Sequence, residues 1–115
     1  MFPEDQVTEL KELCPELKLA SEGGIAYLLM PALALPDGCT PARSDALLSP
    51  TPAHGYPSRL FFPQIIECKA KKVPNWNGKN IHILDRTWQT YSWNVKPGLR
   101  LAQILLEHMR ALRCI

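Results

Sequence analysis

Residues 75–94 carry the side chains of this sequence best suited to acid–base and acyl-transfer chemistry. His82 is followed by a carboxylate at Asp85 and by hydroxyls at Thr87 and Ser92. A neutral imidazole can accept a proton from a hydroxyl, and a neighbouring carboxylate can fix its tautomer. A hydroxyl nucleophile needs such a base, because it is weak at neutral pH without one. The stretch is therefore a candidate site, although a packed aromatic loop would have a similar composition.

The remaining histidines and the cysteines do not have the spacing of a metal site. His108 falls on the apolar face of a helical pattern, where a partly buried structural histidine is expected, and His54 lies in a proline-flanked turn. No Cys-x-x-Cys pair occurs, which argues against structural zinc. We expect reduced thiols that mostly pack, and no metal or organic cofactor is implied. The four cysteines are Cys14, Cys39, Cys68 and Cys114.

Composition indicates one cytoplasmic domain spanning residues 1–115. The chain has 115 residues, 46% of them hydrophobic, which suits a single modest core. Its net charge of +2 and one short basic cluster, Lys-Ala-Lys-Lys at 69–72, do not predict nucleic-acid binding. No apolar run is long enough for a membrane span, and the acidic N-terminus is unlike a secretory signal.

Hydrophobic periodicity predicts an α+β fold. A helix is expected over residues 3–14, and a hairpin over residues 17–29 turns at two glycines. Two further strands are expected near residues 44–49 and 59–62, followed by a long irregular loop over 69–96. A second amphipathic helix follows over residues 101–112. These elements predict a four-stranded antiparallel meander packed against helices.

Short motifs, taken in order, resemble the ubiquitin-conjugating (UBC) superfamily, and in particular its small bacterial branch called family E. They are Leu-Pro-Asp-Gly at 35–38, Asp-Ala-Leu-Leu at 45–48, Gly-Tyr-Pro at 55–57, and Trp88-Gln89 with Ser92. The resemblance covers about residues 5 to 113, and the order and spacing of the motifs carry it. It implies an N-terminal helix, a four-stranded meander, an irregular active-site loop and a C-terminal helix. It also implies that the protein acts with a ubiquitin-like protein and an activating-type enzyme, possible components of antiviral defence.

The resemblance also assigns roles to residues, and one of the assignments is unusual. Asn75 matches the asparagine that helps to stabilise the oxyanion, while Val73 replaces the usual histidine of that segment. His82 stands where the acceptor cysteine is expected. Thioester carriage needs a thiol, because a thiolate is a good nucleophile and a thiol a good leaving group. Binding of the partner is assigned to Tyr56, Pro57, Trp88 and Trp93.

Three outcomes stay open. The domain is a non-catalytic module that binds a ubiquitin-like protein; or a hydroxyl of Ser92, Thr87 or Thr90 forms an oxyester with His82 as base; or Cys68 reaches the site. Ser92 is preferred among the hydroxyls because it lies in the Trp-Gln-aromatic-Ser segment. A sheet-based ligand-binding domain unrelated to ubiquitin, with the aromatic stretch as its lid, is a further alternative.

Overall fold

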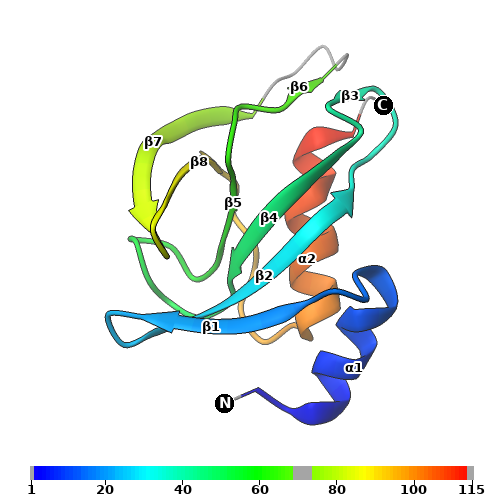
Figure 1. The fold of residues 1–115 in the computed structure, drawn as a ribbon, viewed down its shortest axis with the longest axis vertical. Helices are drawn as coiled ribbons and strands as arrows, with labels where there is room; N and C mark the ends of the chain where they lie inside the picture. Colours follow the sequence, from blue (N-terminus) through cyan, green and yellow to red (C-terminus); the bar gives the residue numbers. More distant parts are fainter. Residues whose placement is uncertain (1, 69–73, 114–115) are drawn as a thin grey trace.

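A computed structural model describes residues 2–68 and 74–113, and confirms the α+β class (Figure 1). Val73 and the basic cluster lie outside the described residues. The elements, in chain order, are α1 (Glu4–Leu13), β1 (Lys18–Glu22), β2 (Ile25–Ala34), β3 (Cys39–Thr40), β4 (Arg43–Ser49), β5 (Arg59–Phe62), β6 (Glu67–Cys68), β7 (Asn75–Ile83), β8 (Arg86–Ser92), α2 (Leu101–Met109) and the 3-10 turn η1 (Arg110–Leu112).

The main sheet has six strands in the order β1-β2-β4-β5-β8-β7, and all neighbours are antiparallel. The predicted meander is present as β1, β2, β4 and β5, but the prediction that the sheet stops at four strands is wrong. Strand β8 continues the sheet because it pairs with β5, with Phe61 opposite Thr90 and Phe62 opposite Gln89. A separate two-stranded sheet, β3-β6, was not predicted.

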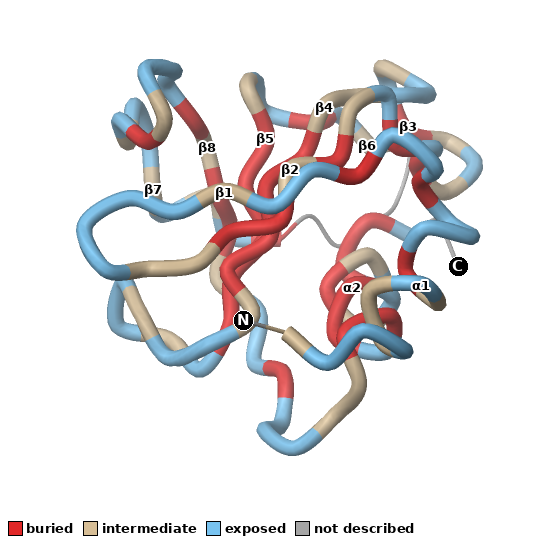
Figure 2. The backbone as a smooth tube through the Cα atoms, turned by 60° about the horizontal axis from the view of Figure 1, so that its bottom comes forward, coloured by how far each residue is buried: buried red, intermediate tan, exposed pale blue. Residues whose placement is uncertain are grey.

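Both helices cover one face of the sheet, and the larger part of the core lies between them and the strands (Figure 2). Leu10 of α1 and Leu105 of α2 are fully buried there with Leu28 and Leu48 from the strands. Each such leucine contributes about 1.5–3 kcal/mol of burial free energy. Arg100 fixes α1 against the start of α2, because its guanidinium donates hydrogen bonds to carboxylates of α1.

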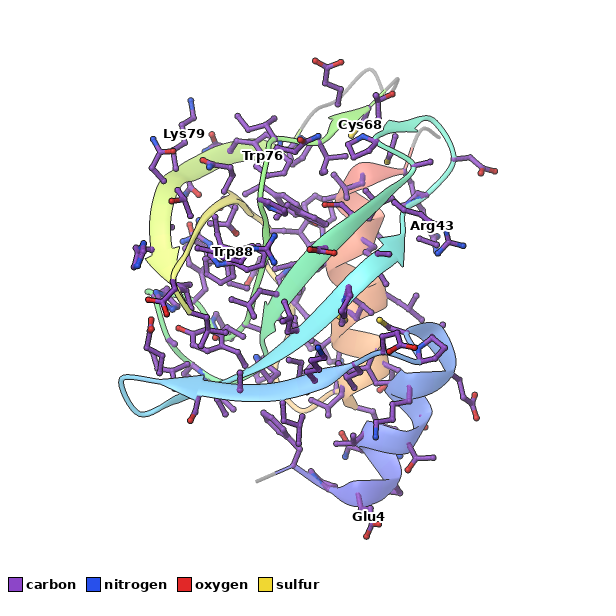
Figure 3. All side chains as sticks on the ribbon, in the orientation of Figure 1. Glu4, Arg43, Cys68, Trp76, Lys79 and Trp88 are labelled. Atoms are coloured by element: carbon purple, nitrogen blue, oxygen red, sulfur yellow. The ribbon has the colours of Figure 1, made fainter. Side chains whose placement is uncertain are left out.

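The opposite face of the sheet is concave and holds a second, smaller apolar cluster. Tyr27, Leu47, Phe61, Ile83 and Trp88 form it, with side chains that alternate with those facing the helices. The sheet curves enough to bring its two ends together, since the backbone N–H of the β7–β8 turn donates to Glu22 Oε1 of β1 at 3.2 Å. Trp88 lies inside the space enclosed by β5, β7 and β8 (Figure 3).

The irregular loop predicted over residues 69–96 is wrong for residues 75–92, which form the β7–β8 hairpin. Its two-residue turn, Leu84-Asp85, has positive φ at both positions (52° and 60°), which is the type I′ geometry that matches strand twist. Two register shifts interrupt β7, on either side of Gly78. A Cβ at Gly78 would lie 2.5 Å from Thr90 Cγ2, so glycine is needed where the two strands approach closely.

Candidate functional site

The hairpin separates the candidate residues of the aromatic stretch into two groups. His82 pairs with Thr87 near the turn, whereas Asn75 pairs with Ser92 at the far end of the hairpin. Ser92 lies five positions after Thr87 along β8, which corresponds to about 16 Å of strand. His82 therefore lies too far from Ser92 to act as its base. Its cross-strand partner is Thr87 instead.

The turn end of the hairpin is open to solvent. His82, Thr87 and Asp85 are exposed, and no hydrogen bond joins the imidazole to the carboxylate of Asp85 within the described parts of the chain. Asp85 occupies a turn position with positive φ, a conformation that aspartate adopts more readily than most residues. Its position is therefore explained by turn geometry, and no carboxylate of the described residues bonds to the His82 imidazole to fix its tautomer.

The two other proposed acceptors, Thr90 and Cys68, are poorly placed to receive an activated tail. Thr90 is fully buried, and its hydroxyl donates to the carbonyl oxygen of Leu60 at 2.6 Å. Cys68 lies on β6, opposite Cys39 of β3, at the end of the molecule where the small sheet is found (Figure 3). An activated tail would have to enter the core to reach Thr90, and Cys68 belongs to a different sheet from the hairpin.

The aromatic residues assigned to partner binding have contrasting environments. Trp88 is fully buried, and its Nε1–H donates to the carbonyl oxygen of Ile83 at 2.9 Å. Its ring cannot contact a partner in this conformation, and its place in the concave cluster is structural. Trp93, in contrast, is 36% exposed directly after Ser92, Pro57 is exposed and Tyr56 is half-buried.

At the far end of the hairpin, Tyr56, Arg59, Asn77 and Ser92 form a connected group, which we call the Arg59 cluster. Tyr56 Oη lies 3.2 Å from Ser92 Oγ and accepts a hydrogen bond from Asn77 Nδ2 at 2.9 Å. The Arg59 guanidinium donates to Asn77 Oδ1 and stacks 4.1 Å from the centre of the Tyr56 ring. These contacts lower the pKa of the Tyr56 phenol, through its hydrogen bond to Ser92, the bond from Asn77 and the charge of Arg59.

Arg59 is the unusual member of the Arg59 cluster because its charge is buried. Only 6% of its surface is exposed, and burial lowers its pKa, although a guanidinium stays protonated at neutral pH. Its Nε–H has no hydrogen-bond acceptor among residues 2–68 and 74–113. The same charge contributes, after desolvation, to the lowered pKa of both His54 and His108.

A serine–histidine pair on the helix side of β5 was not anticipated from the sequence. Ser58 Oγ lies 2.8 Å from Nε2 of the buried His108, beside a groove of about 180 Å³. Burial, followed by the charge of Arg59, lowers the pKa of His108 to about 4. A base that takes the serine proton becomes an imidazolium, which these surroundings disfavour, and no carboxylate bonds to it in the described chain. The pair therefore stabilises the core and is poorly suited to acyl transfer. The groove is lined by Pro50, Thr51, Pro52, Pro57, Ser58, Val95, Lys96, Pro97, Gly98, Leu99 and Ile104.

Comparisons with protein-family models, with curated proteins and with solved structures found no match to this chain. The described residues contain no group of three or more His, Cys, Asp or Glu side chains placed to hold a metal ion. Within the same residues, no helix has the length and apolar character needed to cross a membrane.

Sequence reasoning identified Ser92 and Tyr56 but missed Arg59 and Asn77. The one available signal was an arginine opening the otherwise apolar strand Arg-Leu-Phe-Phe, since a charge next to a buried run needs a partner. Asn77 could not be assigned, because it reaches Arg59 only through the fold of the hairpin.

Proposed function

We propose that this chain is a ubiquitin-conjugating-like protein of a bacterial conjugation pathway, and that it holds the C-terminal tail of a ubiquitin-like protein at the Arg59 cluster. The observation that carries the proposal is the meeting of Ser92 with Tyr56, at 3.2 Å between their hydroxyl oxygens. These two residues come from separate motifs of the family resemblance, 36 positions apart, and the fold brings them together at the surface.

The arrangement of the elements supports this proposal. An N-terminal helix precedes consecutive antiparallel strands, the Tyr-Pro turn comes directly before the last of these, and a C-terminal helix packs on the same face as the first. Exposed Asn75, paired with Ser92, and exposed Trp93 lie beside the Arg59 cluster. An extended tail laid along this end of β8 would meet hydroxyl, amide and aromatic groups, which suit a peptide backbone.

Binding is better supported than transfer, because the hydroxyl route lacks its expected base. His82 is about 16 Å of strand from Ser92, and no cysteine is part of the Arg59 cluster. Carriage as an oxyester on Ser92 is the second candidate. It is favoured by the Tyr56 contact, because a lowered pKa makes the Tyr56 phenolate easier to form, and the phenolate oxygen, once formed, can take the serine proton in place of an imidazole.

Reconstitution tests both candidates. The full chain is incubated with ATP, an activating-type enzyme and a ubiquitin-like protein of such a pathway, and adducts are resolved with and without reductant and hydroxide. In parallel, binding of the isolated ubiquitin-like protein is mapped by amide chemical-shift perturbation. For the binding function, we expect perturbations centred on Tyr56, Asn77 and Ser92.

Matched variants separate the outcomes. A hydroxide-labile, reductant-resistant adduct that disappears in Ser92→Ala but persists in Thr87→Ala establishes carriage on Ser92. Binding without any adduct leaves the chain as an interaction module. If the wild-type chain forms no adduct and shows no binding, the proposed pathway is rejected, provided that the partner proteins are active with each other. The pathway is expected to be cytoplasmic.

A further inference from the structure

Among residues 2–68 and 74–113, Arg59 is a buried cation without an acidic partner. The ion pairs among the described residues are made by Arg86, Arg100 and Arg110, and none involves Arg59. Residues 69–73, which the structure does not describe, contain no acidic side chain. Burial of an unpaired charge is unfavourable by several kcal/mol in general, so such groups are usually paired with an anion.

Asn77 occupies the position where a carboxylate would pair with this guanidinium. Its Oδ1 accepts the hydrogen bond from Arg59 Nη2, but its oxygen is neutral. A hydrogen bond from a guanidinium to an ionised oxygen is about twice as strong as one to a neutral oxygen. Asn77 is itself exposed, so its side chain can turn into solvent and leave the position to another acceptor.

Further donors surround this position. The hydroxyls of Tyr56 and Ser92 lie within one hydrogen-bonded chain with Asn77, and Tyr56 also covers the guanidinium with its ring. Gly78 keeps the backbone of β7 close, because a side chain there would meet Thr90 Cγ2 at 2.5 Å and Arg59 Nη2 at 3.6 Å. A planar anion that replaced the Asn77 amide would thus meet the Arg59 guanidinium and the Tyr56 hydroxyl, with Ser92 next in the hydrogen-bonded chain.

We infer that the Arg59 cluster is a binding site for a carboxylate, which displaces the Asn77 amide from the guanidinium of Arg59. The chemical class is a monoanionic carboxylate, either a small free acid or the C-terminal carboxylate of a peptide. Planar, bidentate pairing with guanidinium favours a carboxylate over a spherical anion such as chloride. The inference identifies the ligand chemistry at the site of the proposed function.

Arg86 provides an internal comparison. It also lies over an aromatic ring, 4.7 Å from the centre of Trp88, but it has a carboxylate from Asp45 at 3.2 Å. The two arginines therefore share the aromatic contact, but Arg86 is exposed and paired with a carboxylate, whereas Arg59 is buried and has none among the described residues. Arg86→Gln is the control for Arg59→Gln.

The test measures the thermal midpoint of the full chain in sodium acetate and in sodium chloride at equal ionic strength. Acetate stabilises many proteins by exclusion from their surface, so the informative quantity is the acetate effect of each variant relative to wild type. Asn77→Ala opens the position and should enlarge the effect. Asn77→Asp supplies the carboxylate within the chain; it should raise the midpoint by on the order of 4 °C and remove the specific response.

Arg59→Gln should weaken acetate binding by at least about tenfold, and Arg86→Gln should leave it unchanged. Arg59→Gln removes a packed, buried side chain, so it also lowers the stability of the fold. Asn77→Asp keeps Arg59 in place and therefore provides an independent measurement. Equal acetate effects in wild type, Asn77→Ala and Asn77→Asp would overturn the inference, and so would an equal response to chloride and acetate.

The source of the carboxylate is tested with acetyl-glycyl-glycine and its C-terminal amide, followed through the Nε–H resonance of Arg59. A shift with the acid alone supports recognition of a free peptide terminus, and equal shifts with acid and amide overturn carboxylate recognition. Acetate binding without binding of any ubiquitin-like protein would keep the carboxylate site and reject the proposed function. Binding of the ubiquitin-like protein without any carboxylate response would keep the proposed function and reject the carboxylate site.

Discussion

The folded protein should lose stability in mild acid because of one buried imidazole. His108 is 1% exposed, and its Nε2 lies 2.8 Å from the hydroxyl of Ser58. Desolvation, followed by the charge of Arg59, lowers the pKa of His108 from 6.5 to about 4. The unfolded chain exposes this imidazole to water and leaves it with a pKa near 6.5.

The sign and the size of the effect follow from this difference. Between pH 6.5 and pH 4 the unfolded chain binds a proton at residue 108 that the folded protein does not bind, so acid favours unfolding. At about 1.36 kcal/mol for each pH unit, the full loss is about 3 kcal/mol, reached near pH 4. Small domains have only about 5–15 kcal/mol of stability, so this loss is a large part of the total.

The assay is urea unfolding followed by circular dichroism at half-unit steps from pH 4 to pH 8. Carboxylates also titrate in this range, so the measurement is the difference in slope between wild type and His108→Gln. The glutamine retains hydrogen-bonding groups for Ser58 but does not titrate.

Two results would refute this reasoning. One is an identical pH dependence for wild type and His108→Gln. The other is an imidazole resonance of His108 that titrates near pH 6.5 in the folded protein. His54 needs its own variant, because burial and then the charge of Arg59 also lower its pKa, and its loss has the same sign. His54 Nε2 forms a hydrogen bond with Tyr27 Oη, at 2.8 Å. Glutamine keeps a hydrogen-bonding group for Tyr27 but does not titrate, so His54→Gln is the suitable substitution.

Three further substitutions test the packing, each measured by urea unfolding at pH 7. Ser49→Ala should cost less than about 1 kcal/mol or stabilise, since the buried Ser49 hydroxyl has no partner within the described residues; a larger loss would reveal one. Gly78→Ala should destabilise by about 1–3 kcal/mol, because its Cβ would clash with Thr90, and wild-type stability would disprove that contact. Trp88→Phe should lower the free energy of unfolding by a similar amount, because it loses the hydrogen bond to the Ile83 carbonyl and part of the buried ring. An unchanged urea midpoint would contradict the burial of Trp88.

The early elements could be predicted because each follows a simple period. Leu10 and its helical neighbours repeat at three to four residues, and the glycine pair at 23–24 marks the first hairpin, with positive φ at both glycines. The buried strands β4 and β5 are short apolar runs between prolines. In these segments, local preference and tertiary burial point to the same structure.

The β7–β8 hairpin could not be read in the same way, because its signals conflict. Strand β7 is a polar edge strand, and the register shifts around Gly78 break the two-residue alternation that identifies a strand. Its turn uses Leu84 where the type I′ geometry normally selects asparagine or glycine. A hairpin with neither alternation nor a recognisable turn resembles a loop in sequence, and this is how His82 and Ser92 came to be grouped in one site.

The charge of Arg59 connects the stability of the protein to the occupancy of the Arg59 cluster. It is the second cause, after desolvation, of the low pKa of His108, a residue of α2 that contacts Ser58 directly before β5. A carboxylate paired with Arg59 would cancel part of this charge, so the pKa of His108 must rise when the site is filled. Asn77→Asp should therefore give a higher His108 pKa than wild type, measured on the imidazole resonance of the folded protein. Because linkage is reciprocal, protonation of His108 must in turn strengthen carboxylate binding. An unchanged His108 pKa in Asn77→Asp would show that the new carboxylate does not reach the guanidinium.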